Sequence, residues 1–374
     1  MKKKLAVFLV GGALVLGTQI NSAKALDVNQ KMSMEGTLTG TYQYAIFNSN
    51  TKDDFGVKNT GKGTTVLDLG INLHPTKTDE FQLTLSYASG NALNEVDPFP
   101  LSTYADDLEA DLYHINGRDR NNLLEAWYKK TIKVPGNASL SFTFGIIDST
   151  VYIDDNAYAN DEVSQFMNDA FVNNPIANLP SYDMGGVLEF SKGAIDIKAL
   201  AMNTKNDDDR NYNYYALQLG YTLDTPWGEG TYRIFGFYTS KAFAGNSGLE
   251  SLKGVGISCD QELTKNIGAF ARWGWQKDDA NVDYTGFYSF GVSLNGNLWG
   301  RSKDVAGIGY AYLDGAKNSS IACTHVLEAY VKFSLFEKED VSSDLTFDFQ
   351  AIKNRESGKD YTGTFYGVRW NTSF

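Results

Sequence analysis

Hydrophobic and polar residues alternate through most of the chain, and this pattern predicts a long series of β-strands. Neighbouring residues of a strand point to opposite faces of a sheet, so strict alternation gives one apolar face and one polar face. Sixteen segments show the pattern, each close to the length of about ten residues that a tilted membrane strand needs. The clearest of them are 37–46, 67–74, 81–87, 140–146, 215–222 and 345–351.

The last of the sixteen segments ends the chain. Tyr366, Val368, Trp370, Thr372 and Phe374 alternate with small or polar residues, and the chain stops at the aromatic residue. A strand that ends without a cap is explained if it closes a barrel against the first strand. Its apolar face would then meet lipid.

The connections between the segments differ in length in a regular way. Short turns are expected at 75–79, 134–137, 191–193, 224–229 and 264–266, and longer polar segments at the alternate positions, notably 48–62, 88–121 and 149–183. Short turns on one rim and long loops on the other are typical of transmembrane β-barrels. The connection 296–304 is long for the rim of short turns. We therefore predict an all-β, antiparallel transmembrane β-barrel of sixteen strands, while fourteen or eighteen strands are also compatible with the pattern.

A soluble β-sandwich or β-helix is the alternative architecture. Its apolar faces would need a shared core. Strands of this number and length, with mostly Thr, Ser, Gly and Gln on the second face, favour the membrane barrel instead.

The amino terminus has the pattern of an export signal. Lys2, Lys3 and Lys4 precede an apolar run from Leu5 to Leu16, and Ala23-Lys24-Ala25 fits a cleavage site. We expect residues 1–25 to be a signal peptide and 26–374 to form the barrel. The expected location is the outer membrane of a Gram-negative bacterium.

Composition narrows the possible functions. The formal charge is −12, which argues against nucleic acid as a partner. Three histidines lie far apart and neither GxSxG nor HExxH occurs, so we expect no enzyme, no cofactor and no bound metal. Cys259 and Cys323 fall near opposite ends of their strands, too far apart for a disulfide. The 22 Tyr and 22 Phe suit the aromatic girdles of a membrane barrel.

Strand parity assigns the charged residues to the inside of the barrel. Arg233 lies between Tyr232 and Ile234, and Arg272 between Ala271 and Trp273, so both point away from the apolar face. Glu125 and Trp127 share an inward face by the same argument. A charge on the lipid-facing side would be costly. These side chains could either line the lumen or brace neighbouring strands.

Several stretches resemble the carbohydrate-selective porin family, the OprB-type porins. They are LLEAWYKK at 123–130, FTFGIIDSTVYIDDNAYANDEVSQFMNDAFVNNP at 142–175, GAFARWGWQ at 268–276, LWGRSKDVAGIGYAYL at 298–313 and HVLEAYVKF at 325–333. The resemblance implies a passive outer-membrane channel that favours sugars. A general or cation-selective diffusion porin stays open as the alternative. The implied partners are small sugars or ions, outer-membrane lipid and the machinery that inserts barrels through the Phe374 strand. A monomer and a homotrimer both stay open.

The loop 149–183 is the third of the long loops, which in sixteen-stranded porins often folds into the lumen. We expect it to narrow the pore and to contain a helix from Ala159 to Val172, with Phe166 and Phe171 packed on the inner wall. Its acidic residues could line the constriction or pin the loop. The expected pore-lining and solute-contacting residues are Arg233, Arg272, Glu125, Trp127, Asp154, Asp155, Asp161 and Glu162.

Overall fold

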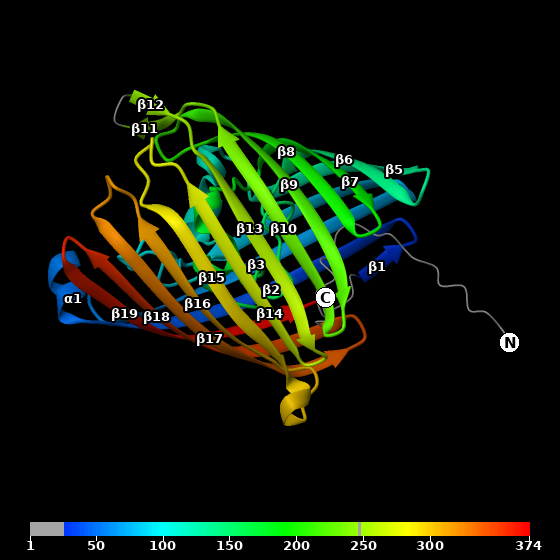
Figure 1. Ribbon diagram of the computed structural model, residues 1–374. Coiled ribbons are helices and arrows are strands. Elements are labelled where there is room, and N and C mark those ends of the chain that lie inside the picture. The colour runs from blue at the N-terminus through cyan, green and yellow to red at the C-terminus, as the bar shows by residue number, and fades with distance from the viewer. Residues whose placement is uncertain (1–25, 246–247) are drawn as a thin grey trace.

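A computed structural model describes residues 26–245 and 248–374, and it shows a closed antiparallel β-barrel (Figure 1). Sixteen strands form the wall, each paired with its neighbour in the chain, and the last strand pairs with the first. The predicted strand number and topology are confirmed. The predicted signal peptide, residues 1–25, lies outside the described residues.

The wall strands are 10 to 18 residues long, which suffices for a tilted strand to cross a membrane. They are β2 (Met32–Phe47), β3 (Thr60–Thr76), β4 (Asp79–Ser89), β5 (Leu123–Val134), β6 (Ala138–Ile147), β7 (Asp183–Lys192), β8 (Ile195–Lys205), β9 (Asn211–Thr225), β10 (Gly228–Thr239), β13 (Lys253–Thr264), β14 (Ile267–Gln276), β15 (Tyr284–Asn295), β16 (Val305–Gly315), β17 (Ile321–Lys338), β18 (Val341–Glu356) and β19 (Lys359–Ser373). A short extra strand, β1 (Leu26–Asn29), pairs with the start of β2. A small hairpin, β11 (Phe243–Gly245) with β12 (Gly248–Glu250), follows β10.

The barrel closes between β19 and β2, as the terminal alternation predicts. Their register runs from the pair Gly363–Phe47 to the pair Ser373–Thr37. Beyond the strand, the backbones of Phe374 and Gly36 exchange two hydrogen bonds of 2.9 Å. The Phe374 ring lies over Gly36, where a Cβ atom would stand 2.4 Å from the ring. Any larger residue at position 36 would therefore displace the Phe374 ring.

The two rims of the barrel differ as expected. On one rim, here called the turn rim, most connections have two or three residues, while the other, the loop rim, carries the long loops. The turn rim also holds β1 and the carboxyl terminus (Figure 1). Short helices lie in the connections: α1 (Ser49–Phe55), α2 (Glu109–Tyr113), η1 (Ile115–Gly117), α3 (Asp169–Val172), η2 (Pro175–Ala177) and η3 (Gly296–Trp299). Within the described residues, no helix has the length and apolar character of a membrane span.

The outer face of the wall is apolar. On β9, Tyr215, Leu217, Leu219 and Tyr221 are all 46 to 58% exposed, while Gln218 between them is fully buried. On β19, Tyr366, Val368 and Trp370 point outward and Arg369 points inward without solvent exposure. This arrangement is the one that a lipid-facing surface requires.

The inner face is less polar than the sequence indicates. Leu313, Val326, Ile352 and Phe365 face inward, although we expected the inward residues to be polar or small. Two long loops, L2 (90–122) and L3 (148–182), cover these residues with apolar side chains of their own, including Phe99 and Phe166. Because the loops exclude water from this part of the lumen, apolar residues are stable there.

Candidate pore constriction

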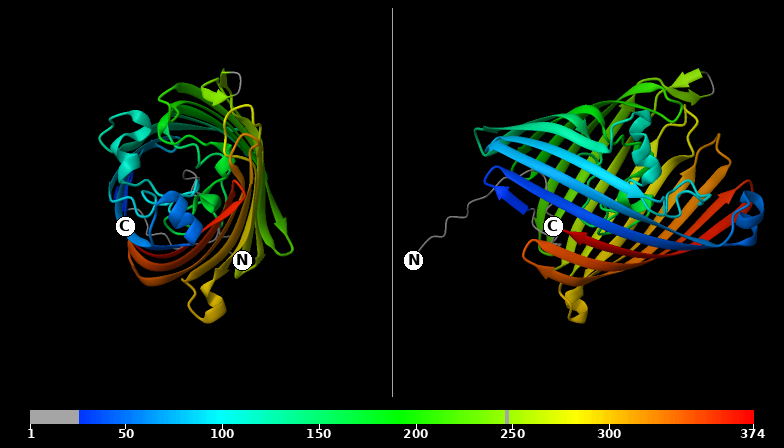
Figure 2. Two further views of the ribbon diagram at one scale, coloured as in Figure 1. Left: turned by 90° about the vertical axis from the view of Figure 1, so that its left-hand side faces the viewer. Right: turned by 180° about the vertical axis from the view of Figure 1, so that it is seen from behind.

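Loop L3 lies inside the ring of strands (Figure 2, left). Asn168 of the loop donates a hydrogen bond of 3.0 Å to Gln350 of β18. Phe166 and Phe171 are fully buried, and both rings pack against Phe270 of β14. The predicted inward folding of the third long loop, and the packing of its two phenylalanines on the wall, are confirmed.

The helix expected over 159–172 is wrong for most of its length, since only Asp169–Val172 is helical. Wall side chains take the backbone groups that a helix would pair internally. Glu328 accepts hydrogen bonds from the N–H groups of residues 167 and 168, at 2.5 and 3.0 Å. Arg369 donates to the carbonyl of Gln165 at 3.1 Å. Partners from the wall thus satisfy the backbone of the loop without a helix.

Arg272 of β14 joins separate segments of L3. Its Nε lies 2.9 Å from Oδ2 of Asp154, and neither side chain is exposed. Its two terminal nitrogens donate to the carbonyls of Asp154, Phe171 and Val172 and to Oδ1 of Asn160, at 2.7 to 3.3 Å. One guanidinium group therefore holds segments of L3 that are up to eighteen residues apart.

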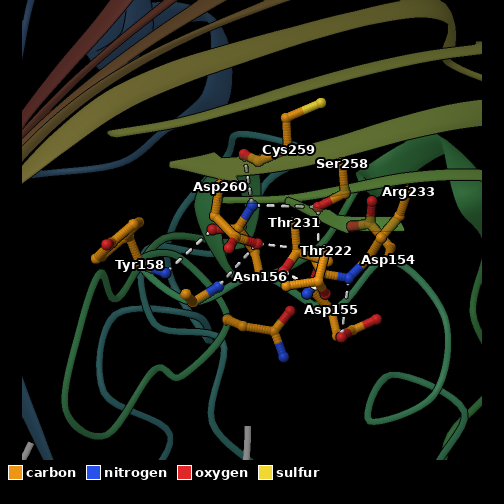
Figure 3. Close-up of polar contacts among 12 residues, drawn as sticks. Asp154, Asp155, Asn156, Tyr158, Thr222, Thr231, Arg233, Ser258, Cys259 and Asp260 are labelled. Atoms are coloured by element: carbon orange, nitrogen blue, oxygen red, sulfur yellow. Dashed lines mark hydrogen bonds and ion pairs between the residues drawn. The ribbon is translucent and has the colours of Figure 1, made fainter. Parts of the chain in front are cut away.

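Arg233 of β10 forms a second attachment (Figure 3). Its Nε lies 3.0 Å from Oδ2 of Asp155, and its Nη1 lies 2.5 Å from Oδ2 of Asp260 on β13. Gln218 also donates to Asp155, at 2.9 Å. Asn156 next to it donates to Oγ of Ser258 at 3.1 Å. The acidic residues at 154 and 155 thus pin the loop, one to each arginine.

The two arginines point inward, as parity predicts, but they lie beneath the loop. Arg233 is 7% exposed and Arg272 is 2% exposed, and carboxylates and carbonyls of the protein accept their hydrogen bonds. The contact with a permeant solute that we expected of them stays a prediction. Their observed contacts give both a positioning role.

Glu125 and Trp127 lie on the inner face of β5, where parity places them. Trp127 donates to Glu125 at 3.3 Å, and Thr84 of β4 donates to the same carboxylate at 2.9 Å. The indole packs against the apolar cluster that Ile147 and Ile153 share. Both residues lie apart from the two arginine attachments, because several strands of the wall separate β5 from β10 and β14.

Asp161 and Glu162 behave differently from each other. Asp161 caps a single turn of L3 by accepting from the N–H groups of Val163 and Ser164, at 2.8 and 3.0 Å. Among the described residues, no basic side chain pairs with the carboxylate of Glu162, and burial raises its pKa well above the ordinary value. The carboxylate lines a cavity instead.

This cavity, the L2–L3 chamber, lies between the two inward loops and has a volume of about 350 Å³. Four carboxylates line it, from Asp107, Asp148, Glu162 and Asp169, together with the amides of four asparagines and the hydroxyls of Thr150, Ser181 and Tyr182. No lysine or arginine is among its lining residues. A second cavity of about 450 Å³ adjoins it at the loop rim and shares Asp107, Ser181 and Tyr182 with it.

Burial affects the charge of the chamber. It raises the pKa of the Asp169 carboxyl to about 6, although the carboxylate accepts a hydrogen bond from the N–H of Ser102. It also raises the pKa of the Asp148 carboxyl, against the opposing hydrogen bonds from Thr150. These carboxylates are therefore ionised at neutral pH less completely than free aspartates. In the described part of the chain, no group of His, Cys, Asp and Glu is arranged to hold a metal ion.

The sequence analysis missed several residues of the constriction. Asp107 from L2 and Asp169, the first residue of α3 in L3, both line the chamber, but they lie in loops where no strand alternation gives the direction of a side chain. Arg369 could have been found, because it sits between the outward Val368 and Trp370 and must point inward. Its fully buried side chain donates to the carbonyls of Glu162 and Gln165.

Comparison with known protein families assigns the chain to one of them. The model of the family described as "Carbohydrate-selective porin, OprB family" matches residues 80–323, more than half of the chain. The chain belongs to the OprB family. Members of this family are outer-membrane channels rather than enzymes, and the barrel fits that location. An uncharacterized protein of Aquifex aeolicus is 33% identical to this OprB-family chain over 276 residues, which cover 73% of the chain and 78% of the relative.

Solved structures support the same fold. The high-pH structure of Pseudomonas putida OprB superposes with a TM-score of 0.70 at 14% identity, covering 92% of this chain and 94% of that one. The outer membrane channel DcaP of Acinetobacter baumannii gives a TM-score of 0.56 at 11% identity, covering 94% of this chain and all of that one. Because both sequence identities are so low, the similarity to these two channels shows only that this OprB-family porin shares their fold.

Proposed function

We propose that this porin lets small polar solutes, carbohydrates in particular, diffuse passively across the outer membrane through a water-filled pore narrowed by L3. The lining of the L2–L3 chamber is the observation that carries this proposal. Carboxylates and amide and hydroxyl groups can replace the water around sugar hydroxyls, which both donate and accept hydrogen bonds. A volume of about 350 Å³ falls at the lower end of the range of about 300–1,000 Å³ that is usual for small-molecule sites.

A general or cation-selective porin without sugar preference is the second candidate. It is favoured by the four carboxylates of the chamber, which have no lysine or arginine beside them in the lining. Carboxylate-lined constrictions attract cations and repel anions. Arg233 and Arg272, which attach L3 to the wall, form ion pairs with Asp154, Asp155 and Asp260. They therefore do not offset the negative charge of the chamber.

The remaining parts of the chain fit the same proposal. Residues 1–25 serve as a cleaved export signal, and the Phe374 strand is the segment that the insertion machinery contacts. Permeation needs no cofactor and no energy source, because solutes move down their gradient. Assembly into a homotrimer is compatible with the apolar outer wall.

Single-channel recording in planar bilayers tests the proposal. With a carbohydrate porin, mono- or disaccharides reduce the conductance in a saturable way, and Asp169→Asn weakens that effect. As a control, Asp360→Asn alters an exposed carboxylate at the loop rim that pairs with Lys353 and Arg355, and it should leave the sugar effect unchanged. Conductance indifferent to sugars but selective for cations would favour the second candidate. Absence of any conductance would exclude both.

A further inference from the structure

The long turn 295–304 between β15 and β16 has an ordered conformation that its own hydrogen bonds hold in place. Its short helix η3 is capped at its start by Asn295, whose side chain accepts from the N–H of Asn297 at 2.9 Å, and at its end by Gly300 with a φ of 81°. Gly296 allows close backbone approach, since a Cβ atom there would lie 1.9 Å from the carbonyl oxygen of Arg301. The side chain of Asp304 is 1% exposed and accepts from Arg301 Nε at 2.5 Å and from the indole of Trp299 at 3.2 Å. The turn therefore has one defined shape.

The turn lies against the outer, lipid-facing side of the wall. Arg301 extends over the ring of Phe333, 5.8 Å from its centroid, and donates to the carbonyl of Ser334 at 3.0 Å. Phe333 belongs to the outward set of β17 and packs against Phe347, which is 47% exposed on the outer face. Lys303 pairs with Glu337 further along the same strand, at 2.6 Å. Figures 1 and 2 show η3 hanging from the turn rim outside the ring of strands, away from the lumen.

Two apolar side chains are presented at the tip of this turn. Leu298 is 51% exposed and Trp299 is 40% exposed. Leu335 and Phe336, at the end of β17 beside the turn, are 53 and 52% exposed and extend the apolar outer wall to the rim. The exposed pair is thus continuous with the surface that faces lipid. Tryptophan with its N–H satisfied, beside basic side chains, is the composition found where a protein meets lipid head groups.

We propose that the turn 295–304 is a membrane-interface anchor, in which Leu298 and Trp299 insert among the phospholipids of the inner leaflet of the outer membrane. Arg301 and Lys303 lie at the level of the phosphate groups. A fixed anchor on one side of the rim resists vertical movement and tilting of the barrel. This role explains why the connection is long where the other turns of this rim have two or three residues.

Fluorine NMR on the full mature chain in phospholipid nanodiscs tests the anchor. The six tryptophans are labelled with 5-fluorotryptophan, and single Trp→Phe variants assign the six signals. Phosphatidylcholine carrying a nitroxide near its head group is then added. Trp370, 40% exposed on the outer face near the turn rim, is the lipid-facing control, and Trp127, on the inner face, is the lumen control.

The expected result is that the Trp299 signal broadens as strongly as that of Trp370, while Trp127 keeps its linewidth. If Trp299 stays sharp while Trp370 broadens, the turn projects into water and the proposal is overturned. If the Trp299→Phe variant does not fold, the Trp299 signal is identified as the one that remains after the other five tryptophan signals have been assigned. Conductance of the same samples reports separately on the channel, so a failure of the anchor does not resemble a failure of the porin function.

Discussion

Replacing Arg272 with methionine should release L3 from the wall. Methionine fills much of the same volume but removes the charge and all the donors that now reach Asp154, Asn160, Phe171 and Val172. Asp154 would keep the hydrogen bond of 2.7 Å from the N–H of Asn174, but its carboxylate would be buried without a counter-charge. Removing one partner of a buried ion pair typically costs about 3–5 kcal/mol.

That cost acts on the attachment of the loop, because the sixteen paired strands of the wall stay intact. Since about 1.4 kcal/mol corresponds to a factor of ten, the equilibrium for loop release should rise roughly a hundred- to several-thousand-fold. Two assays measure it. Chymotrypsin added from the loop side should cleave after Phe166 or Phe171 much faster, since cleavage follows the population of the open form when reclosing is fast. Single-channel records should show larger and noisier conductance.

The matched control is Arg355→Met, because Arg355 pairs with Asp360 at 3.0 Å on the surface and is 54% exposed. Exposed ion pairs contribute little, so this variant should keep the protease resistance of the parent. The double variant Arg272→Met with Asp154→Asn should recover part of the resistance, because it leaves no unpaired buried charge. Equal resistance and conductance in the parent and in Arg272→Met would refute the view that this arginine holds the loop.

Three further predictions concern the charge and the closure of the barrel. Burial raises the pKa of Glu162 well above its ordinary value, so Glu162→Gln should lower the cation preference, measured as the reversal potential in a salt gradient, at a pH above that raised pKa, where the carboxylate is charged; an unchanged potential at that pH would place it off the solute path. The raised pKa of Asp169, about 6, means that this carboxyl is charged above that pH and loses its charge as the pH falls through 6, so the part of the cation preference that depends on Asp169 should be lost around pH 6. A decline that begins only near pH 4, the ordinary range of aspartate, would contradict this. Gly36→Ala should lower the yield of folded barrel on heat-modifiability gels by displacing the Phe374 ring, whereas Gly40→Ala, with 3.7 Å to its nearest neighbour, should not; equal yields would refute the closing role of this contact.

The period of two along the chain was enough to predict the wall. It gave the number of strands, the closure of β19 on β2 and the direction in which Arg233, Arg272 and Glu125 point. These features are local consequences of strand geometry and of the cost of placing charge against lipid. Parity also held for Arg369, whose inward direction could be derived from its outward neighbours alone.

The interior of the barrel depended on contacts that no local pattern contains. Arg272 and Asp154 form an ion pair although they are 118 residues apart in the sequence. Most of the segment 159–172 does not form the helix that we expected, because Glu328 and Arg369 bind its backbone groups from distant strands. The apolar inward residues likewise became stable only when L2 and L3 covered them. A sequence fixes which face of a strand each side chain occupies, because that follows from neighbouring residues. The partner that it meets across the lumen is decided only when the sheet closes and brings remote segments together.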